Sequence, residues 1–310
     1  MSGLNLYRRA VLGVAGVPLV ERWGRRHGWR LGARRFVAGE DVASALPALR
    51  QLEAAGMGAI VDVLGEYVRD RAAAEAMASA IRGTIEALSG AGLPPIVSVK
   101  PSQLGLGLDP ELAVELAVAL ALRTEAAGGR VCLDMEDHRF VDATLRLLGR
   151  LHDAGARATS TVLQAYLHRT PGDLDALLRA GPAGGEVRIV KGAYHERADV
   201  ALQEVEAIRR AFVSACEHAW ALGAKVNVAT HDEALIRETT AFARGAGLGR
   251  DRFELQLLFG VRPRLQRRLV DEGLPVRVYV PVGADWYGYF SRRLAERPAN
   301  AVVVLRGMLG

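Results

Sequence analysis

The chain has 310 residues, half of them apolar, which is enough to bury a large core in one domain of about 250 residues with a smaller additional segment. This composition argues against a disordered chain, and two cysteines, Cys132 and Cys216, are too few for a disulfide framework, so a reducing compartment is expected. Residues 1–35 hold eight arginines and one glutamate, a net of +7, which leaves about −2 of the total of +5 for the other residues. The high positive charge therefore belongs to one end of the chain, and no nucleic-acid partner is expected.

The first 45 residues form the most basic part of the sequence. An apolar run at residues 10–20 lies among arginines, is shorter than the about 20 residues that span a bilayer, and contains Pro18. A signal peptide also has a basic start before an apolar run, but here no small-residue cleavage pattern follows and arginines resume at once. We interpret residues 1–45 as a basic helical arm that packs on the main domain or lies on an anionic membrane surface.

From residue 46 onward, apolar strand-like segments alternate with amphipathic ones. Strands are expected at residues 59–64, 95–100, 130–135, 158–163, 186–191, 224–231, 253–258 and 276–282. Helices are expected between them, for example at residues 110–127, 140–154, 200–222 and 233–245, which are rich in Ala, Leu, Glu and Arg. Eight strands alternating with helices predict an α/β fold, a closed (β/α)8 TIM-type barrel over residues 46–310, in preference to an open doubly wound sheet.

The carboxyl ends of the strands carry the chemistry in barrels of this kind. Polar or ionisable residues follow or end nearly all of the predicted strands: Glu66, Lys100, Asp134, Gln164, Lys191, Thr230, His231 and Tyr279. An inert barrel would also end its strands in polar residues at the solvent, so only the joint pattern indicates a site. Lysine occurs three times in the chain and ends two of these strands. These two lysines are therefore less expected to be ordinary solvent-exposed surface residues. The seven histidines show no metal-ligand spacing, and we predict no metal site.

The last predicted strand leads into a pair of arginines. Gly283 ends the apolar run at residues 276–282, and Asp285 is suited to cap a helix that carries Arg292 and Arg293 in its early turns. Two neighbouring guanidinium groups, each a planar fork of donors, suit a carboxylate or phosphate held in one orientation. The alternative is an exposed basic helix face.

Residues 279–300 resemble the C-terminal motif of the proline dehydrogenase family, in which a strand Tyr, a Pro-x-Gly turn and an Arg-Arg pair followed by Leu and Glu occur in this order. The resemblance extends from about residue 56 to residue 300, and residues 188–194 give its most specific internal match. It implies a distorted barrel whose displaced last helix lies over the active site. It also implies a monofunctional, FAD-dependent enzyme that oxidises L-proline to 1-pyrroline-5-carboxylate. In such an enzyme a hydride passes from ring C5 to flavin N5, and the electrons pass to a membrane quinone.

The same resemblance implies a role for each strand-end residue. Asp134 and Arg188 are assigned to catalysis, with Arg188 near the reactive edge of the flavin, and Glu66 is assigned as a gate. We expect Asp134 to fix neighbouring donors or the lysine, and we do not assign it as a general base. The substrate-binding residues implied are Lys100, Leu258, Tyr279, Arg292 and Arg293. The cofactor-binding residues implied are Met135, Gln164, Arg188, Val190, Lys191, Gly192, Ala193, Thr230 and His231.

Other interpretations of the same residues stay open. Lys191 alone would also suit a Schiff-base lyase of the barrel aldolase kind, and His231 alone is more often a structural hydrogen-bonding residue. A barrel that only binds a membrane surface is the non-enzymatic alternative. The glycines at residues 245–249 precede a strand, whereas a dinucleotide-binding loop follows one, so we interpret them as a turn. The expected location is cytoplasmic, with or without peripheral attachment to the inner face of the cytoplasmic membrane.

Overall fold

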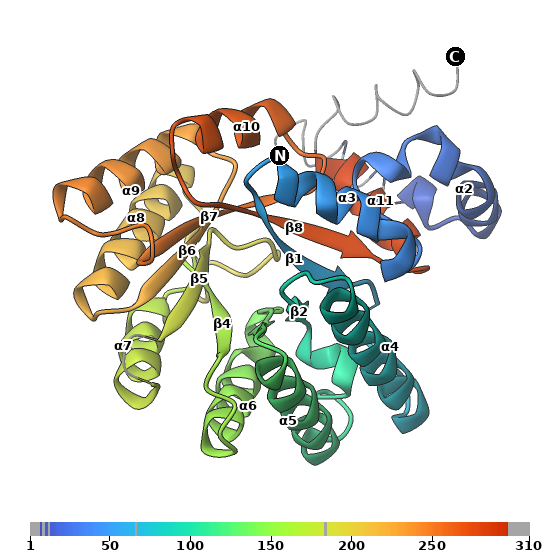
Figure 1. Cartoon of the computed structure of the whole chain (residues 1–310), viewed down its shortest axis with the longest axis horizontal. Helices are drawn as coiled ribbons and strands as arrows, with labels where there is room; N and C mark the ends of the chain where they lie inside the picture. Colours follow the sequence, from blue (N-terminus) through green and yellow to red (C-terminus); the bar gives the residue numbers. More distant parts are fainter. Residues whose placement is uncertain (1–6, 8–9, 12, 66, 183–184, 297–310) are drawn as a thin grey trace.

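The protein forms a closed barrel of eight parallel strands surrounded by helices, as the computed structural model shows (Figure 1). The structure describes residues 7, 10–11, 13–65, 67–182 and 185–296. The strands are β1 (Gly58–Val63), β2 (Ile96–Val99), β3 (Arg130–Leu133), β4 (Thr159–Gln164), β5 (Glu186–Val190), β6 (Lys225–Ala229), β7 (Phe253–Leu258) and β8 (Val276–Val282). Each predicted strand is present, with bounds that differ by at most two residues, and β8 pairs with β1 to close the barrel.

The helices lie outside the strands and bury the main core between the two layers. They are α2 (Pro18–Leu31), α3 (Val42–Ala54), α4 (Arg71–Gly90), α5 (Pro110–Ala126), α6 (Val141–Asp153), α7 (Thr170–Ala180), α8 (Val205–Ala221), α9 (Glu233–Gly245), α10 (Pro263–Asp271) and α11 (Trp286–Glu296). Aspartates begin several of them: the carboxylate of Asp70 accepts a hydrogen bond from the Ala73 amide at the start of α4 (2.8 Å), and Asp109 caps α5 in the same way.

The segment before α8 departs from the expected helix at residues 200–222. The amide of Leu202 donates to the carbonyl of Tyr166 (2.8 Å), and the carbonyl of Val200 accepts from the His168 amide (3.1 Å). These backbone groups pair with the loop between β4 and α7, so they are not available for a helical turn, and α8 begins at Val205.

The seam between β8 and β1 is covered by a helix that precedes the barrel in the chain. α3 packs against both of these strands, in the place where the last helix of a regular (β/α)8 barrel lies. The amide of Ala38, just before α3, donates to the carbonyl of Pro281 on β8 (3.0 Å). The last helix, α11, is displaced and packs on α2 instead (Figure 1), so the predicted distorted barrel is confirmed.

The N-terminal arm is folded onto the displaced helix. The Trp29 and Trp286 rings lie 5.7 Å apart, and Gly24 and Gly28 of α2 allow close approach of the Tyr287 and Trp286 rings. The predicted boundary between residues 45 and 46 falls inside α3, and the division into two domains stays a prediction. Within the described part of the chain, no helix combines the length and apolarity needed to cross a membrane.

Candidate active site

Asp134 is the centre of a hydrogen-bonded cluster at the carboxyl ends of the strands. Its carboxylate follows β3 and accepts hydrogen bonds from the hydroxyl of Ser98 (2.6 Å), from Nη1 of Arg188 (2.7 Å) and from the hydroxyl of Tyr279 (2.7 Å). Nζ of Lys100 lies 3.7 Å from its second oxygen. Residues from β2, β3, β5 and β8 thus meet at one carboxylate inside the barrel.

The charges around Asp134 keep its carboxylate ionised. Burial alone would raise the pKa of Asp134, but the positive charges of Arg188 and Lys100 outweigh it and lower this pKa below its usual value. Burial, together with the neighbouring carboxylate of Asp134, raises the pKa of Tyr279 well above its usual value. Tyr279 is therefore a neutral phenol that donates its proton in the hydrogen bond to Asp134.

Lys100 is held mainly by a second carboxylate, Asp62 on β1. Its Nζ donates to both oxygens of Asp62, at 3.0 and 3.1 Å. Asp62 is almost fully buried, and this burial raises its pKa despite the adjacent ammonium. No role for Asp62 follows from the sequence, although a carboxylate inside an otherwise apolar strand was a signal that it needs a buried partner.

Arg188 connects the cluster to the middle of the barrel. Its guanidinium is buried, lies 5.5 Å from the centre of the Tyr279 ring, and donates through Nη1 to Ser98 (3.2 Å) as well as to Asp134. Its Nε donates to the side-chain carbonyl of Gln256 on β7 (2.6 Å). Arg188 and Asp134, both predicted from the sequence as site residues, are thus in direct contact.

Several residues expected to hold the cofactor lie around this cluster. Gln164, at the end of β4, is buried; its amide nitrogen donates to the carbonyl of Glu136 (2.6 Å), while its amide oxygen has no hydrogen-bond partner among the described residues. Met135 packs in the same apolar cluster inside the barrel as Tyr279. Val190 ends β5, and Ala193 is exposed in the loop that follows.

The loop after β5 is shaped by Gly192 and anchored by Lys191. Gly192 has φ +118°, and a Cβ there would lie 2.2 Å from the Tyr166 ring, so only glycine fits. Nζ of Lys191 donates to the Asp232 carboxylate (2.7 Å), which also accepts from Arg209 (2.9 Å). An ion-paired ammonium is not nucleophilic, and this geometry therefore disfavours the Schiff-base alternative.

The loop after β6 is bound to the end of β7. The Leu258 amide donates to Nε2 of His231 (2.9 Å), so Nε2 is the acceptor nitrogen of that ring. The hydroxyl of Thr230 accepts from the Asp232 amide (3.1 Å). Leu258 lies opposite Tyr279 in the pairing of β7 with β8.

The arginine pair lies on α11, and both side chains are half-buried. The Arg293 guanidinium lies 5.1 Å from the centre of the Tyr289 ring, one turn earlier in the same helix. Glu66, the expected gate, lies outside the described residues.

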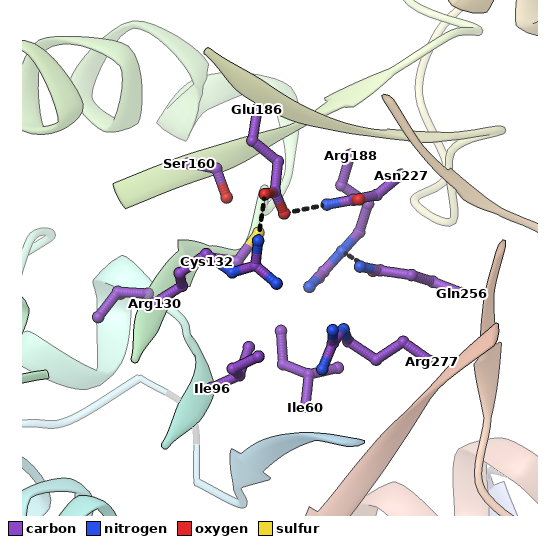
Figure 2. A pocket seen from close by; sticks show the side chains of 11 residues that line it. Ile60, Ile96, Arg130, Cys132, Ser160, Glu186, Arg188, Asn227, Gln256 and Arg277 are labelled. Carbon is purple, nitrogen blue, oxygen red and sulfur yellow. Dashed lines mark hydrogen bonds and ion pairs between the residues drawn. The ribbon is translucent and has the colours of Figure 1, made fainter. Parts of the chain in front are cut away.

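A small cavity lies deeper in the barrel, toward the amino ends of the strands (Figure 2). Its volume is about 10 Å³, room for one water molecule and far too little for an amino acid. Ion pairs between residues at or near the starts of strands lie around it: Glu186 pairs with Arg130 (3.1 Å) and Lys225 (3.2 Å), and Glu254 pairs with Arg277 (2.7 Å). The floor of the barrel is therefore closed, and the candidate site is the cluster above it.

Comparison with known proteins identifies the family. The family model described as proline dehydrogenase matches residues 45–306. The chain belongs to the proline dehydrogenase family. It is 43% identical to "Proline dehydrogenase" of Deinococcus radiodurans over 98% of both chains, and 35% identical to "Proline dehydrogenase 1" of Bacillus subtilis over 98% of this chain and 99% of the other. The family predicted from the sequence is confirmed, and the protein is an enzyme of this family.

Solved structures share this fold. This chain superposes on the crystal structure of proline utilization A (PutA) from Bdellovibrio bacteriovorus, a protein inactivated by N-propargylglycine. The TM-score is 0.78 at 22% identity. The match covers 84% of this chain and 32% of that longer one. At this identity the likeness supports the barrel architecture alone.

Proposed function

We propose that the protein is an FAD-dependent enzyme that oxidises L-proline to 1-pyrroline-5-carboxylate. The observation that carries this proposal is the cluster of Asp134, Lys100, Arg188 and Tyr279 at the carboxyl ends of the strands, in a chain of the proline dehydrogenase family. The cluster presents two cations and a neutral phenol beside the buried carboxylates of Asp134 and Asp62, which suits a small zwitterion with an apolar ring.

The residues around the cluster fit a flavin. The buried amide oxygen of Gln164, without a partner among the described residues, is an acceptor suited to a ring N–H of an isoalloxazine. Gln164, Arg188, Lys191 and His231, together with Met135, Val190, Gly192, Ala193 and Thr230, are proposed to hold the cofactor. When bound, FAD supplies the hydride acceptor that the side chains of the protein lack.

The substrate side of the site follows from the charges of proline. Lys100, Arg292 and Arg293 are proposed to bind its carboxylate, while Tyr279 and Leu258 pack on the pyrrolidine ring and orient C5 toward the cofactor. Oxidation removes a hydride from C5 and a proton from the ring nitrogen, leaving a C=N bond. Nearby cations favour the loss of that proton, and Asp134 keeps Arg188 and Tyr279 in place rather than accepting it. Glu66 is proposed as the gate that closes the site.

The arm gives the enzyme a route to a membrane quinone, the acceptor that we propose for its electrons. Leu19 and Trp23 of α2 are 70% and 48% exposed, and Arg22 and Arg26 beside them are exposed as well. Apolar side chains among arginines suit the interface of an anionic bilayer. We therefore propose a cytoplasmic enzyme whose arm attaches it to the membrane surface.

The first experiment is an anaerobic absorbance spectrum of the purified protein, before and after addition of L-proline. We expect a flavin spectrum that bleaches with L-proline and stays unchanged with hydroxyproline. A colourless protein that remains without cofactor after incubation with FAD would overturn the proposal. That result would favour the alternative in which Lys191 forms a Schiff base. In that case, borohydride trapping with carbonyl substrates is the measurement to make next.

A further inference from the structure

Gln256 stands between the candidate site and the floor of the barrel. It lies midway along β7, is 5% exposed, and accepts the hydrogen bond from Nε of Arg188 at 2.6 Å (Figure 2). The Nη1 of the same guanidinium donates to Asp134 at 2.7 Å. Arg188 is thus held at two separate nitrogens, one facing the site and one facing β7.

The amide of Gln256 can serve as this acceptor only in one orientation. Its nitrogen donates to the carboxylate of Glu254 (3.0 Å), two residues earlier on the same inward face of β7. Glu254 is in turn ion-paired with Arg277 (2.7 Å), whose positive charge outweighs the effect of burial and lowers the pKa of Glu254 below its usual value. An ionised Glu254 accepts hydrogen bonds but cannot donate them, so it binds the amide nitrogen and turns the oxygen toward Arg188.

An arginine side chain needs such an anchor because it has several freely rotating bonds. With only its contacts to Asp134 and Ser98, the guanidinium could swing about those two groups, whereas a hydrogen bond at Nε fixes its plane. Displacement of a charged group at a site by about 1 Å can cost on the order of 100-fold in rate. The anchor therefore bears on function as well as on folding.

We propose that Gln256 and Glu254 are positioning residues that hold the Arg188 guanidinium against Asp134. The proposal rests on the proposed function only in assigning Arg188 and Asp134 to the reaction. The polar chain runs from Arg277 through Glu254 and Gln256 to Arg188, and so links the ion pairs at the floor of the barrel to the guanidinium that binds Asp134. Under this proposal, Gln256 and Glu254 of β7 affect the site through Arg188 and not by direct contact with the substrate.

A double-mutant cycle tests this link without any enzyme assay. Gln256→Leu and Asp134→Asn are made singly and together in the full-length protein with matched FAD content, and urea unfolding is measured. Arg188 is the described residue that hydrogen-bonds to both positions, so we expect the unfolding constant of the double variant to differ at least about threefold from the product of the single effects. Purely additive effects would overturn the proposal, whether or not proline is the substrate.

Asn227→Ala is the matched control. Asn227 is a buried amide in the same interior layer and lies opposite Arg188 in the pairing of β5 with β6. Its nitrogen donates to Glu186 (2.6 Å), and no hydrogen bond is found between its side chain and Arg188 or Asp134 among the described residues, so its effect should add to that of Asp134→Asn. If Gln256→Leu does not fold, Glu254→Gln takes its place in the cycle, with the same criterion. Additivity for Glu254→Gln would then count against the proposal.

Kinetics separate positioning from a general loss of stability. With L-proline, kcat should fall about 10-fold in Gln256→Leu and change little in Asn227→Ala, because of these two residues only Gln256 accepts the hydrogen bond from Nε of Arg188. A kcat that is unchanged in Gln256→Leu, or equally low in both variants, would contradict the proposed role.

Discussion

The hydroxyl of Tyr279 donates to the carboxylate of Asp134 across 2.7 Å, and this contact joins the last strand of the barrel to the loop after the third. Removal of the hydroxyl in Tyr279→Phe takes one donor from a buried anion, an interaction worth about 1.5–3 kcal/mol. We expect kcat/KM for L-proline to fall about 10-fold or more, measured by steady-state kinetics. Unchanged kinetics would mean that the contact does not contribute to the reaction.

The size of the same side chain is expected to decide between proline and its ring-hydroxylated analogue. A phenol packed on the pyrrolidine ring leaves little room for a ring hydroxyl, so Tyr279→Ser should raise the ratio of kcat/KM for hydroxyproline to that for proline by about 10-fold. The matched control is Tyr279→Phe, which keeps the ring and should leave this ratio unchanged. Equal ratios in all three proteins would show that Tyr279 does not set specificity.

Asp232 makes stability depend on pH. Burial would raise its pKa, but the hydrogen bonds and charges of Lys191 and Arg209 outweigh this and lower the pKa of Asp232 to about 2. Because the folded-state pKa lies below the unfolded value near 3.8, the stabilisation is present at neutral pH and is lost as pH falls from about 4 to about 2. Asp232→Asn should therefore reduce the free energy of unfolding by about 1–2 kcal/mol at pH 7, after allowance for partial solvent exposure.

Urea titrations at pH 7 and near pH 3 measure this difference. The two proteins should differ less at the lower pH, because near pH 3 the Asp232 carboxyl is largely protonated in the unfolded state but still mostly ionised in the folded state. Asparagine keeps the side-chain oxygen that caps α9, so the cap is matched in the comparison. A difference that stays constant with pH would assign the effect to something other than the ionised carboxylate.

Gly192→Ala combines an unfavourable backbone with a steric clash. The left-handed φ of +118° disfavours any side chain, and the new methyl group would meet the Tyr166 ring, so we expect a loss of about 1–3 kcal/mol in unfolding free energy and weaker FAD binding. Gly92→Ala is the control, because Gly92 has φ +73° and no atom within 4 Å of the added methyl. Thermal unfolding should show the larger loss for Gly192→Ala, and equal losses would mean that the contact with Tyr166 relaxes freely.

The arm is expected to bind anionic vesicles through its exposed apolar residues. The double variant Leu19→Ser with Trp23→Ser should lose most of its co-sedimentation with phosphatidylglycerol vesicles, while activity with a soluble electron acceptor stays unchanged. Leu122→Ser, at an exposed position on α5, is the control for general loss of surface apolarity. Equal binding of the vesicles by the double variant and by Leu122→Ser would show that Leu19 and Trp23 do not form the membrane contact.

The strands and the strand-end residues were predictable because both follow from local patterns. Apolar β-branched runs between helices locate the strands. In a parallel barrel every strand ends on the same face, so Lys100 and Asp134, which follow the neighbouring strands β2 and β3, had to lie near each other. Tyr279 lies within β8, and its place beside Asp134 does not follow from a strand end. The resemblance to one family then supplied the roles that residue types alone left open.

The supporting residues were not predictable in the same way. Asp62 and Gln256 lie within strands, and whether such a side chain pairs with Lys100 or Arg188 depends on the register between strands that are distant in sequence. The start of α8 was predicted too early because the backbone of residues 200–202 hydrogen-bonds to a loop about 35 positions earlier in the chain. No local sequence pattern indicates such a contact.

Because α3 covers the seam between β8 and β1, α11 is not needed as part of the barrel wall. In a regular barrel the last helix must keep an apolar face for that wall, and its sequence is constrained accordingly. Here that constraint falls on a helix that precedes the first strand, and the buried rings of α11 pack on the N-terminal arm instead. Closure of the barrel and the placement of α11 are therefore carried by different helices, so a substitution in α3 should disturb the barrel wall and one in α11 should disturb the arm.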